Sequence, residues 1–170
     1  DNSLIESEDI KFNDNLVQKD LMRAAILCND STSVDGKEIG DPTEVALVNL
    51  GHVHSLNEQD VRDEFKRLKE IPFDSDRKLM STLHYIDNKY VMYTKGALDV
   101  LLDRTTHIRT SEGVKEITQA DKDRILNTNQ YLSENGLRVL SFAYKELDSE
   151  KELSLDDENN YTFLGLISMI

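Results

Sequence analysis

The sequence has few of the residues that build special scaffolds. Its 170 residues include one cysteine, two prolines, seven glycines and no tryptophan. A single cysteine cannot close an intrachain disulfide, which excludes a disulfide scaffold and a cysteine-rich zinc site. No stretch approaches the roughly 18 consecutive apolar residues that indicate a membrane-spanning helix. The sequence also contains no Walker-type phosphate loop and no HExxH metal motif, so no strong catalytic constellation is present.

Basic residues are scarce relative to acidic ones. Twenty Lys and Arg residues face 33 Asp and Glu residues, which gives a formal net charge of -13. This balance argues against a surface that holds DNA, RNA or anionic lipid, because such surfaces are rich in Lys and Arg. We therefore expect no nucleic-acid partner and no membrane contact by this segment. The sequence gives no sign of an oligomer, so a monomer is expected. The length predicts a single domain over residues 1–170.

Hydrophobic periodicity predicts an α+β fold, in which helices flank a twisted, mostly antiparallel sheet of hairpin-joined strands. The turn Asp87-Asn88 suits a tight hairpin, because both residues tolerate left-handed backbone. The expected helices cover residues 16–28, 41–51, 58–68, 97–103 and 118–134. The expected strands cover 79–86, 90–95, 137–144 and 161–170, with a further polar hairpin over 105–117.

The remaining segments are predicted to be irregular. Residues 1–14 suit a short strand or tether, and residues 29–40 suit a loop of turn formers. Residues 146–160 hold seven acidic side chains and one lysine, which predicts a solvated loop. The apolar run at 163–170 suggests a segment cut from a longer protein.

The segment that follows Pro72 places an aromatic residue beside two cations. Phe73 precedes Arg77 and Lys78 in a charged turn, an arrangement that can stack a base and meet phosphate. The alternative is a Phe73 ring tucked under a loop, with the two cations paired to Asp74 and Asp76.

Three further residues have both a functional and an ordinary interpretation. Lys95 ends a strand where Gly96 permits a sharp turn into a helix, so it could meet an anion or simply be exposed. Arg138, near the start of a strand, could contact phosphate or be a surface cross-strand charge. Glu44 follows the predicted helix cap Asp41 by three residues and could serve only as a capping-box acid.

Taken in order, five segments resemble the nucleotide-binding domain of P-type cation-transporting ATPases, and most closely the calcium-pump branch. The resemblance extends over about residues 14–170. The five segments are residues 25–31 (AILCNDS), 40–47 (GDPTEVAL), 73–81 (FDSDRKLMS), 95–97 (KGA) and 136–140 (GLRVL).

The resemblance implies an ATP site. Phe73 is expected to stack on adenine, Glu44 to receive the adenine amino group, and Lys95 to line the base of the adenine pocket. The full set of implied nucleotide-binding residues is Glu44, Phe73, Lys78, Lys95, Gly96, Ala97, Arg138 and Leu140. None of them is expected to be catalytic, and no metal site is expected in the chain.

The phosphate end of the site is implied by the same resemblance. Lys78 corresponds to a basic residue near the nucleotide, Arg138 to an arginine that reaches the polyphosphate, and Leu140 to an apolar wall. Ser75 stands where calcium pumps of the animal reticulum have a basic residue. That departure removes one cation near the phosphates, which is expected to weaken binding.

Several parts of a complete pump are not found in the sequence. It has neither the Asp-Lys-Thr-Gly-Thr segment that carries the phosphorylated aspartate nor the Thr-Gly-Glu and Gly-Asp-Gly segments of the family. The resemblance therefore implies a binding domain on the cytosolic side of a membrane pump, separated from the phosphorylation and actuator domains that would be its partners. It would grip ATP by the adenine end and present the γ-phosphate to the phosphorylation domain. Mg²⁺ is expected only in the full-length pump.

Two other hypotheses remain open at the level of sequence. The chain could be an interaction module that docks a regulatory partner through the acidic residues 146–160. It could also be a free-standing phosphotransferase, although the missing phosphate loop and Asp-Lys-Thr-Gly segment speak against that.

Overall fold

The computed structural model describes Ile5 and residues 15–170, so the strand or tether expected over residues 1–14 lies almost wholly outside the described residues. The helices are α1 (Leu16–Leu27), α2 (Pro42–Val53), α3 (Glu58–Glu64), α4 (Leu98–Asp103), α5 (Gln119–Glu134) and the short 3-10 helix η2 (Leu155–Asp157). The strands are β1 (Thr32–Val34), β2 (Lys37–Ile39), β3 (Lys69–Asp74), β4 (Leu79–Ile86), β5 (Lys89–Gly96), β6 (Thr105–Thr110), β7 (Gly113–Glu116), β8 (Arg138–Leu147) and β9 (Tyr161–Met169).

Seven of the strands form one sheet with the order β3-β4-β5-β8-β9-β6-β7. Every neighbouring pair in it is antiparallel except β6 and β9, which run parallel. Strands β1 and β2 form a separate two-stranded sheet. The predicted α+β class, with a mostly antiparallel sheet flanked by helices, is therefore confirmed.

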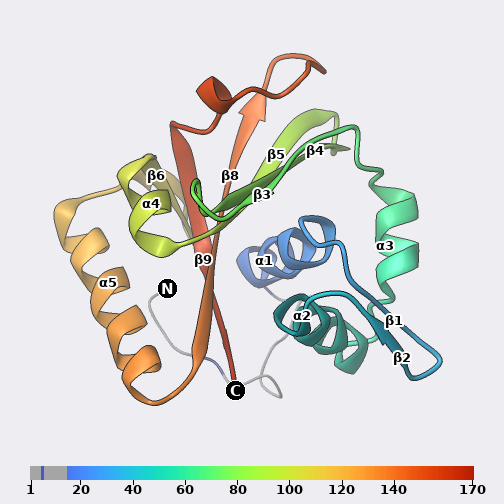
Figure 1. The fold of residues 1–170 in the computed structure, drawn as a ribbon. Coiled ribbons are helices and arrows are strands. Elements are labelled where there is room, and N and C mark those ends of the chain that lie inside the picture. The colour runs from blue at the N-terminus through green and yellow to red at the C-terminus, as the bar shows by residue number, and fades with distance from the viewer. Residues whose placement is uncertain (1–4, 6–14) are drawn as a thin grey trace.

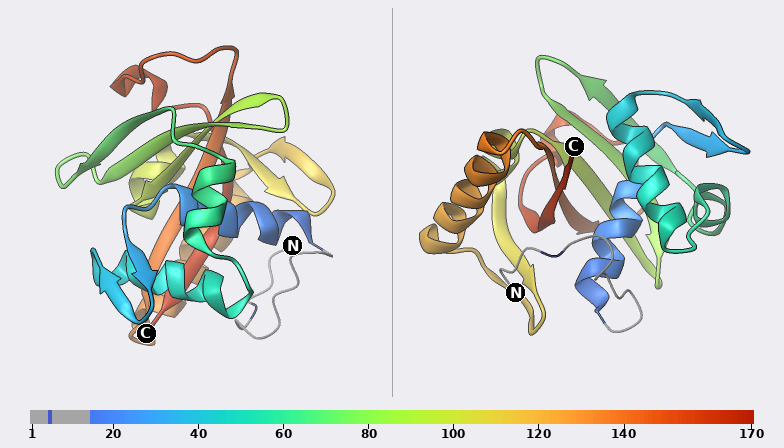
Figure 2. Two further views of the ribbon diagram at one scale, coloured as in Figure 1. Left: turned by 90° about the vertical axis from the view of Figure 1, so that its right-hand side faces the viewer. Right: turned by 90° about the horizontal axis from the view of Figure 1, so that it is seen from below.

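The two faces of the sheet bury different sets of side chains. Tyr93 and Phe142 pack into a core with α1, whereas Met92 and Ala143, their neighbours in the chain, belong to a core on the opposite face. This alternation follows from the two-residue period of strands. Figures 1 and 2 show α1, α2 and α3 on one side of the long strands β8 and β9, with α4 and α5 on the other.

Tight turns account for one correct and one wrong prediction. Asp87 and Asn88 have φ values of 52° and 65°, so they form the expected left-handed hairpin turn between β4 and β5. The loop expected over residues 29–40 instead contains the β1–β2 hairpin, which turns at Asp35 and Gly36 with φ values of 51° and 77°. An Asp-Gly pair is a strong hairpin signal, and the flanking strands were missed because they are only three residues long.

The helix expected over residues 58–68 is also shorter than predicted. It ends at Glu64, and the amide of Leu68 already donates to the Leu83 carbonyl at 2.8 Å, where the ladder to β4 begins. Strand β3, which was not predicted, contains Pro72. Proline lacks an amide donor and would be excluded from a central strand. The proline is tolerated because β3 lies at the edge of the sheet.

The other helices agree with the sequence at their starts. Asn15 caps α1, Asp41 caps α2 with Pro42 in the first turn, and Thr118 forms a capping box with Asp121 at the start of α5. The end of α2 differs from the prediction, because the helix continues through Gly51 to Val53. None of the helices in the described part of the chain is long and apolar enough to cross a membrane.

The acidic segment over residues 146–160 was wrongly predicted to be solvated throughout. Strand β8 extends to Leu147, and η2 forms further along. Asp157 and Glu158 are buried, with exposed fractions of 9% and 1%. Their burial requires partners, since an isolated carboxylate is costly to remove from water.

Candidate functional site

The candidate site is centred on a buried ion pair between Glu44 and Lys95. Asp41 accepts hydrogen bonds from the amides of Thr43 and Glu44, at 2.8 and 3.4 Å, which starts α2 and places Glu44 in its first turn. The Glu44 carboxylate contacts the Lys95 ammonium at the end of β5, and their side chains are only 16% and 8% exposed. Lys95 is therefore not the exposed lysine of an ordinary turn.

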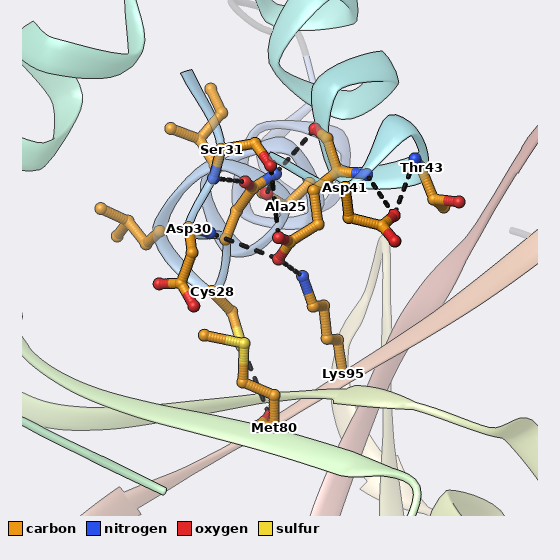
Figure 3. Close-up of polar contacts among 12 residues, drawn as sticks. Ala25, Cys28, Asp30, Ser31, Asp41, Thr43, Met80 and Lys95 are labelled. Carbon is orange, nitrogen blue, oxygen red and sulfur yellow. Dashed lines mark hydrogen bonds and ion pairs between the residues drawn. The ribbon is translucent and has the colours of Figure 1, made fainter. Parts of the chain in front are cut away.

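The loop between α1 and β1 holds the Glu44 carboxylate from its other side. The amide of Asp30 donates to Oε2 and the hydroxyl of Ser31 donates to Oε1, both at 3.3 Å. Figure 3 shows Lys95 rising from the sheet toward this loop and the start of α2. Glu44 thus faces the sheet and the loop, in contrast to the capping role that its spacing also allowed.

Asn29 locks the same loop against both helices. Its side-chain amide donates to the carbonyl of Ala25 in α1 at 3.1 Å and to the carbonyl of Glu44 in α2 at 3.0 Å. Its side-chain oxygen accepts from the Ser31 amide at 2.8 Å. Asn29 and Ser31 were not predicted as site residues, although both lie in the AILCNDS segment that contributed to the resemblance.

Beneath this cluster, Cys28 and Met80 join α1 to the sheet. The Cys28 thiol donates to the Met80 carbonyl at 3.4 Å, and Figure 3 shows the two residues in contact below the loop. Burial raises the pKa of the Cys28 thiol, and nearby Lys95 only partly opposes that rise. The thiol therefore stays protonated at neutral pH and serves as a packing group.

Gly96 and Ala97 connect the Lys95 segment to the turn between β3 and β4. The Ala97 amide donates to the Lys78 carbonyl at 3.2 Å, and the Ser141 hydroxyl donates to the Gly96 carbonyl at 2.6 Å. A Cβ atom on Gly96 would collide with the Lys78 carbonyl oxygen. Glycine is therefore required here by the close approach of two backbone segments.

Phe73 lies on the edge strand β3, at the level where Met80 of β4 pairs with Lys95 of β5. Ile71 pairs with Ser81 and Asp74 pairs with Leu79, so Pro72 and Phe73 together oppose Met80 in a bulge. Met80 is in turn the partner of Lys95 on the next strand. The Phe73 side chain is 59% exposed, so the alternative of a ring tucked under a loop is wrong.

The cations of the β3–β4 turn do not pair with Asp74 and Asp76, as the alternative interpretation had it. Arg77 forms its ion pair with Glu158, at 2.7 Å, rather than with the nearby aspartates. Asp74 instead accepts from the amides of Arg77 and Asp76, at 3.0 and 2.8 Å, and these bonds lower the pKa of its carboxyl. Lys78 is exposed on this turn, with a left-handed φ of 64°.

Arg138 and Leu140 lie together at the start of β8. The exposed Arg138 guanidinium donates to the Thr43 hydroxyl at 3.1 Å, which brings it to the first turn of α2 beside Glu44. Leu140 is half-buried and packs against the core that contains α1. The structure thus brings Glu44, Lys95 and Arg138 together at the start of α2. Phe73 lies on β3, with β4 between it and the strand of Lys95.

A separate hollow of about 300 Å³ contains none of the predicted site residues. Its charged groups compensate one another, as the 2.5 Å ion pair between Arg109 and Asp20 illustrates. It is lined by Asp20, Arg23, Ile86, Asp87, Lys89, Val91, Tyr93, Arg109, Tyr144 and Glu146. In the described part of the chain, no group of three or more His, Cys, Asp or Glu side chains is arranged to hold a metal ion.

A twisted, mostly antiparallel sheet with helices on both faces agrees with the fold that the resemblance implied. Residues 17–170 match the family model described as P-type ATPase, cytoplasmic domain N. The chain belongs to this family. The description as a cytoplasmic domain agrees with the expected position on the cytosolic side of a membrane pump.

Individual relatives support the same assignment. A calcium-transporting ATPase of Bacillus cereus is 41% identical over 171 residues, covering 100% of this chain and 19% of that protein. A calcium-transporting ATPase of Listeria monocytogenes is also 41% identical, and one of Lactococcus lactis is 42% identical, each over 155 residues. These two alignments cover 90% of this chain and 18% of each relative, so the chain spans about a fifth of the length of these proteins.

Proposed function

We propose that this domain binds ATP by its adenine end and presents the γ-phosphate to the phosphorylation domain of a P-type pump. Because the relatives described above are named calcium-transporting ATPases, we further propose that the pump transports Ca²⁺. The phosphorylation and actuator domains of the same full-length protein would be its partners. The chain itself would act as a binding domain and not as a complete catalyst.

The hydrogen-bonding capacity of Glu44 fits an adenine amino group. An ionised carboxylate offers about four lone-pair sites and can only accept hydrogen bonds. Lys95 and the Asp30 amide take two sites on Oε2, and the Ser31 hydroxyl takes one on Oε1. One acceptor site therefore remains for the exocyclic amino group of adenine. The carbonyl of guanine at the equivalent position would meet an acceptor and be rejected.

Phe73 supplies the stacking face of the proposed site. An aromatic ring that is 59% exposed at a sheet edge contributes little to the core and is available to a flat ligand. Base stacking on such a ring is worth roughly 1–3 kcal/mol. Few contacts on an open face predict modest and reversible binding, which suits a domain that must release nucleotide in every cycle.

The phosphate end of ATP would meet Arg138 and Lys78. Both are exposed, and the Arg138 guanidinium retains several donors beyond the one that contacts Thr43. Mg²⁺ would accompany the nucleotide only in the full-length pump. With acidic residues in excess over the whole chain, these two exposed cations would offer the phosphates a local electrostatic attraction.

The observation that carries the proposal is the exposed Phe73 on the edge strand β3, across β4 from the Glu44–Lys95 pair. It is tested by an amide-shift NMR titration with ATP, comparing the wild-type chain with Phe73→Ala. Tyr131→Ala is the matched control, because Tyr131 is 58% exposed and lies on the distant helix α5. Loss of the stacking energy is expected to raise the Kd of the Phe73 variant roughly five- to hundredfold.

The control variant is expected to bind ATP as the wild type does, and both variants should keep the wild-type Tm. If Phe73→Ala binds ATP as tightly as the wild type while remaining folded, the proposal fails. The same outcome, combined with binding of a protein partner that is lost on removal of residues 148–153, would favour the interaction-module alternative.

A further inference from the structure

A buried carboxylate lies at the base of the hairpin that carries Phe73. The side chain of Glu158 is fully buried, and its Oε2 accepts a 2.5 Å hydrogen bond from the Ser81 hydroxyl of β4. The hydroxyls of Ser81 and Thr94 are 2.7 Å apart, as are those of Thr94 and Tyr161. This chain of hydroxyls connects the segment after η2 to three strands of the sheet.

The other carboxylate oxygen of Glu158 reaches the β3–β4 turn through Arg77. Arg77 Nε lies 2.7 Å from Glu158 Oε1, in an ion pair that lacks the alignment of a hydrogen bond. The terminal nitrogen of Arg77 donates to the carbonyls of Pro72 at 2.9 Å and Leu79 at 2.6 Å. Arg77 therefore ties both strands of the hairpin together, and one tie is at the residue directly before Phe73.

Glu158 cannot itself contact a nucleotide bound beside Lys95. Ser81 and Thr94 lie on the sheet face of Leu79 and Met92, whereas Lys95 lies on the α1 side, two residues from Tyr93. Glu158 thus approaches the sheet from the face opposite to Glu44 and Lys95. Any effect of Glu158 on the proposed site must pass through Arg77 and the hairpin.

We propose that Glu158 is a positioning residue for nucleotide binding, which holds the Phe73 hairpin in place through Arg77. The inference rests on the proposed function, since it assigns a role to a residue outside the ATP site. Its physical basis is that Arg77 is only 13% exposed and depends on Glu158 for its charge partner. Removal of one member of a buried pair leaves the other charge uncompensated, so Arg77 would move toward water.

The test is the variant Glu158→Gln in the 170-residue chain, with ATP affinity measured by NMR titration. Glutamine keeps an acceptor for Ser81 but removes the charge that holds Arg77. We expect the Kd to rise roughly three- to tenfold, less than for Phe73→Ala, because the ring remains but is less well placed. Glu58→Gln is the matched control, since Glu58 is also fully buried and pairs with His52 at 2.9 Å, away from the hairpin. Its Kd is expected to equal that of the wild type.

A double-mutant cycle separates positioning from general destabilisation. If Glu158 acts through the ring, Glu158→Gln should not change the Kd further in a chain that already carries Phe73→Ala. A structural effect would weaken binding by the same factor in both backgrounds, and that result would overturn the proposal. A folded Glu158→Gln chain with the wild-type Kd would also overturn it.

A second variant covers the case in which Glu158→Gln fails to fold. Arg77→Lys keeps the positive charge, but a lysine cannot bond Pro72, Leu79 and Glu158 at once. It should therefore raise the Kd for ATP by the same factor as Glu158→Gln. In a chain that already carries Phe73→Ala, it should not raise the Kd further. Hydrogen exchange of the amides in residues 73–78 gives a readout that does not use ATP. Faster exchange in Glu158→Gln than in Glu58→Gln is expected, and equal exchange contradicts the positioning role. Absence of ATP binding by the wild type would overturn the proposed function and with it the role of Glu158 in nucleotide binding, whereas the exchange measurement would still show whether Glu158 holds the hairpin.

Discussion

The carboxylate of Glu44 in α2 and the ammonium of Lys95 in β5 form an ion pair that joins the first helix turn of the candidate site to the sheet. Both side chains are at least four-fifths buried. Breaking such a pair leaves one charge without compensation, which typically costs about 3–5 kcal/mol of stability. We therefore expect Lys95→Met and Glu44→Gln each to lower the free energy of unfolding by several kcal/mol, as measured by urea denaturation.

The double variant Lys95→Met with Glu44→Gln is the informative comparison. Because it leaves no unpaired charge, it should lose clearly less stability than the sum of the two single losses, with a coupling of about 1–3 kcal/mol. Additive losses would mean that the two groups do not depend on each other. The double variant should still bind ATP poorly, because the acceptor for the adenine amino group has changed.

Arg138 is expected to affect the phosphate end of the ligand and not the base. The variant Arg138→Ala removes an exposed guanidinium whose bond to Thr43 lies at the surface, so its Tm should stay close to that of the wild type. A hydrogen bond to a charged group contributes roughly 1.5–3 kcal/mol, which predicts a weakening of ATP binding by about tenfold or more. Adenosine, which has no phosphate, should bind both chains equally well in the same NMR titration.

Lys89→Ala is the control for this prediction. Lys89 is an exposed cation at the opposite end of β5, where it pairs with Glu146 at 3.4 Å. Its removal changes the net charge of the chain by the same amount as Arg138→Ala. Equal losses of ATP affinity in the two variants would show that overall charge, and not a local contact, explains the effect.

Gly96→Ala should disturb the site through the backbone. The added methyl group would meet the Lys78 carbonyl and the Leu79 side chain, so β4 and β5 must separate at this point. Overpacking of this kind costs about 1–3 kcal/mol, and we expect both a lower Tm and a higher Kd for ATP. Gly113→Ala is the comparison, because Gly113 has a φ of 119° at the distant β6–β7 turn and no atom near its Cβ position. It should lower the Tm through backbone strain while leaving the Kd unchanged.

Elements with strong local signals could be predicted from the sequence. Asp41-Pro42 and Thr118 with Asp121 mark helix starts by satisfying free amides locally, and the Asp87-Asn88 turn sets its own hairpin. Strand β3 could not be predicted in this way, because Pro72 is acceptable only at a sheet edge. Which strand lies at the edge depends on the whole topology and not on the local sequence.

The site was predicted in part, and for a different reason. Single residues such as Lys95 and Arg138 carried no decisive local signal, and only the series of five segments pointed to them together. The Glu44–Lys95 pair joins residues 51 positions apart. The position of Glu158 could not be predicted either, since an acidic segment indicates solvent unless its buried partners, Arg77 and Ser81, are known.

The stability of the fold is expected to depend on pH through His84. This imidazole is 1% exposed; its Nδ1 lies 2.9 Å from the Phe65 carbonyl, and its Nε2 lies 2.9 Å from the Thr82 hydroxyl. Since a carbonyl only accepts, Nδ1 carries the proton and Nε2 accepts from Thr82, so the neutral ring is fully satisfied. Burial lowers the pKa of His84 from 6.5 to about 4, and the bonds to the Phe65 and Lys66 carbonyls only partly oppose this.

Because the pKa of His84 is lower in the folded state than in the unfolded state, the folded state loses stability as the pH falls. Above pH 6.5 His84 is neutral in both states and its contribution is fully present. As the pH falls from 6.5 toward 4, the unfolded chain binds a proton that the folded chain does not, and stability is lost. The loss should reach roughly 3 kcal/mol at pH 4, at about 1.4 kcal/mol per pKa unit. In urea denaturation at pH 7, 6 and 5, His84→Asn should start from a lower stability but fall less steeply with pH than the wild type. Parallel falls in the two chains would assign the acid sensitivity to other groups.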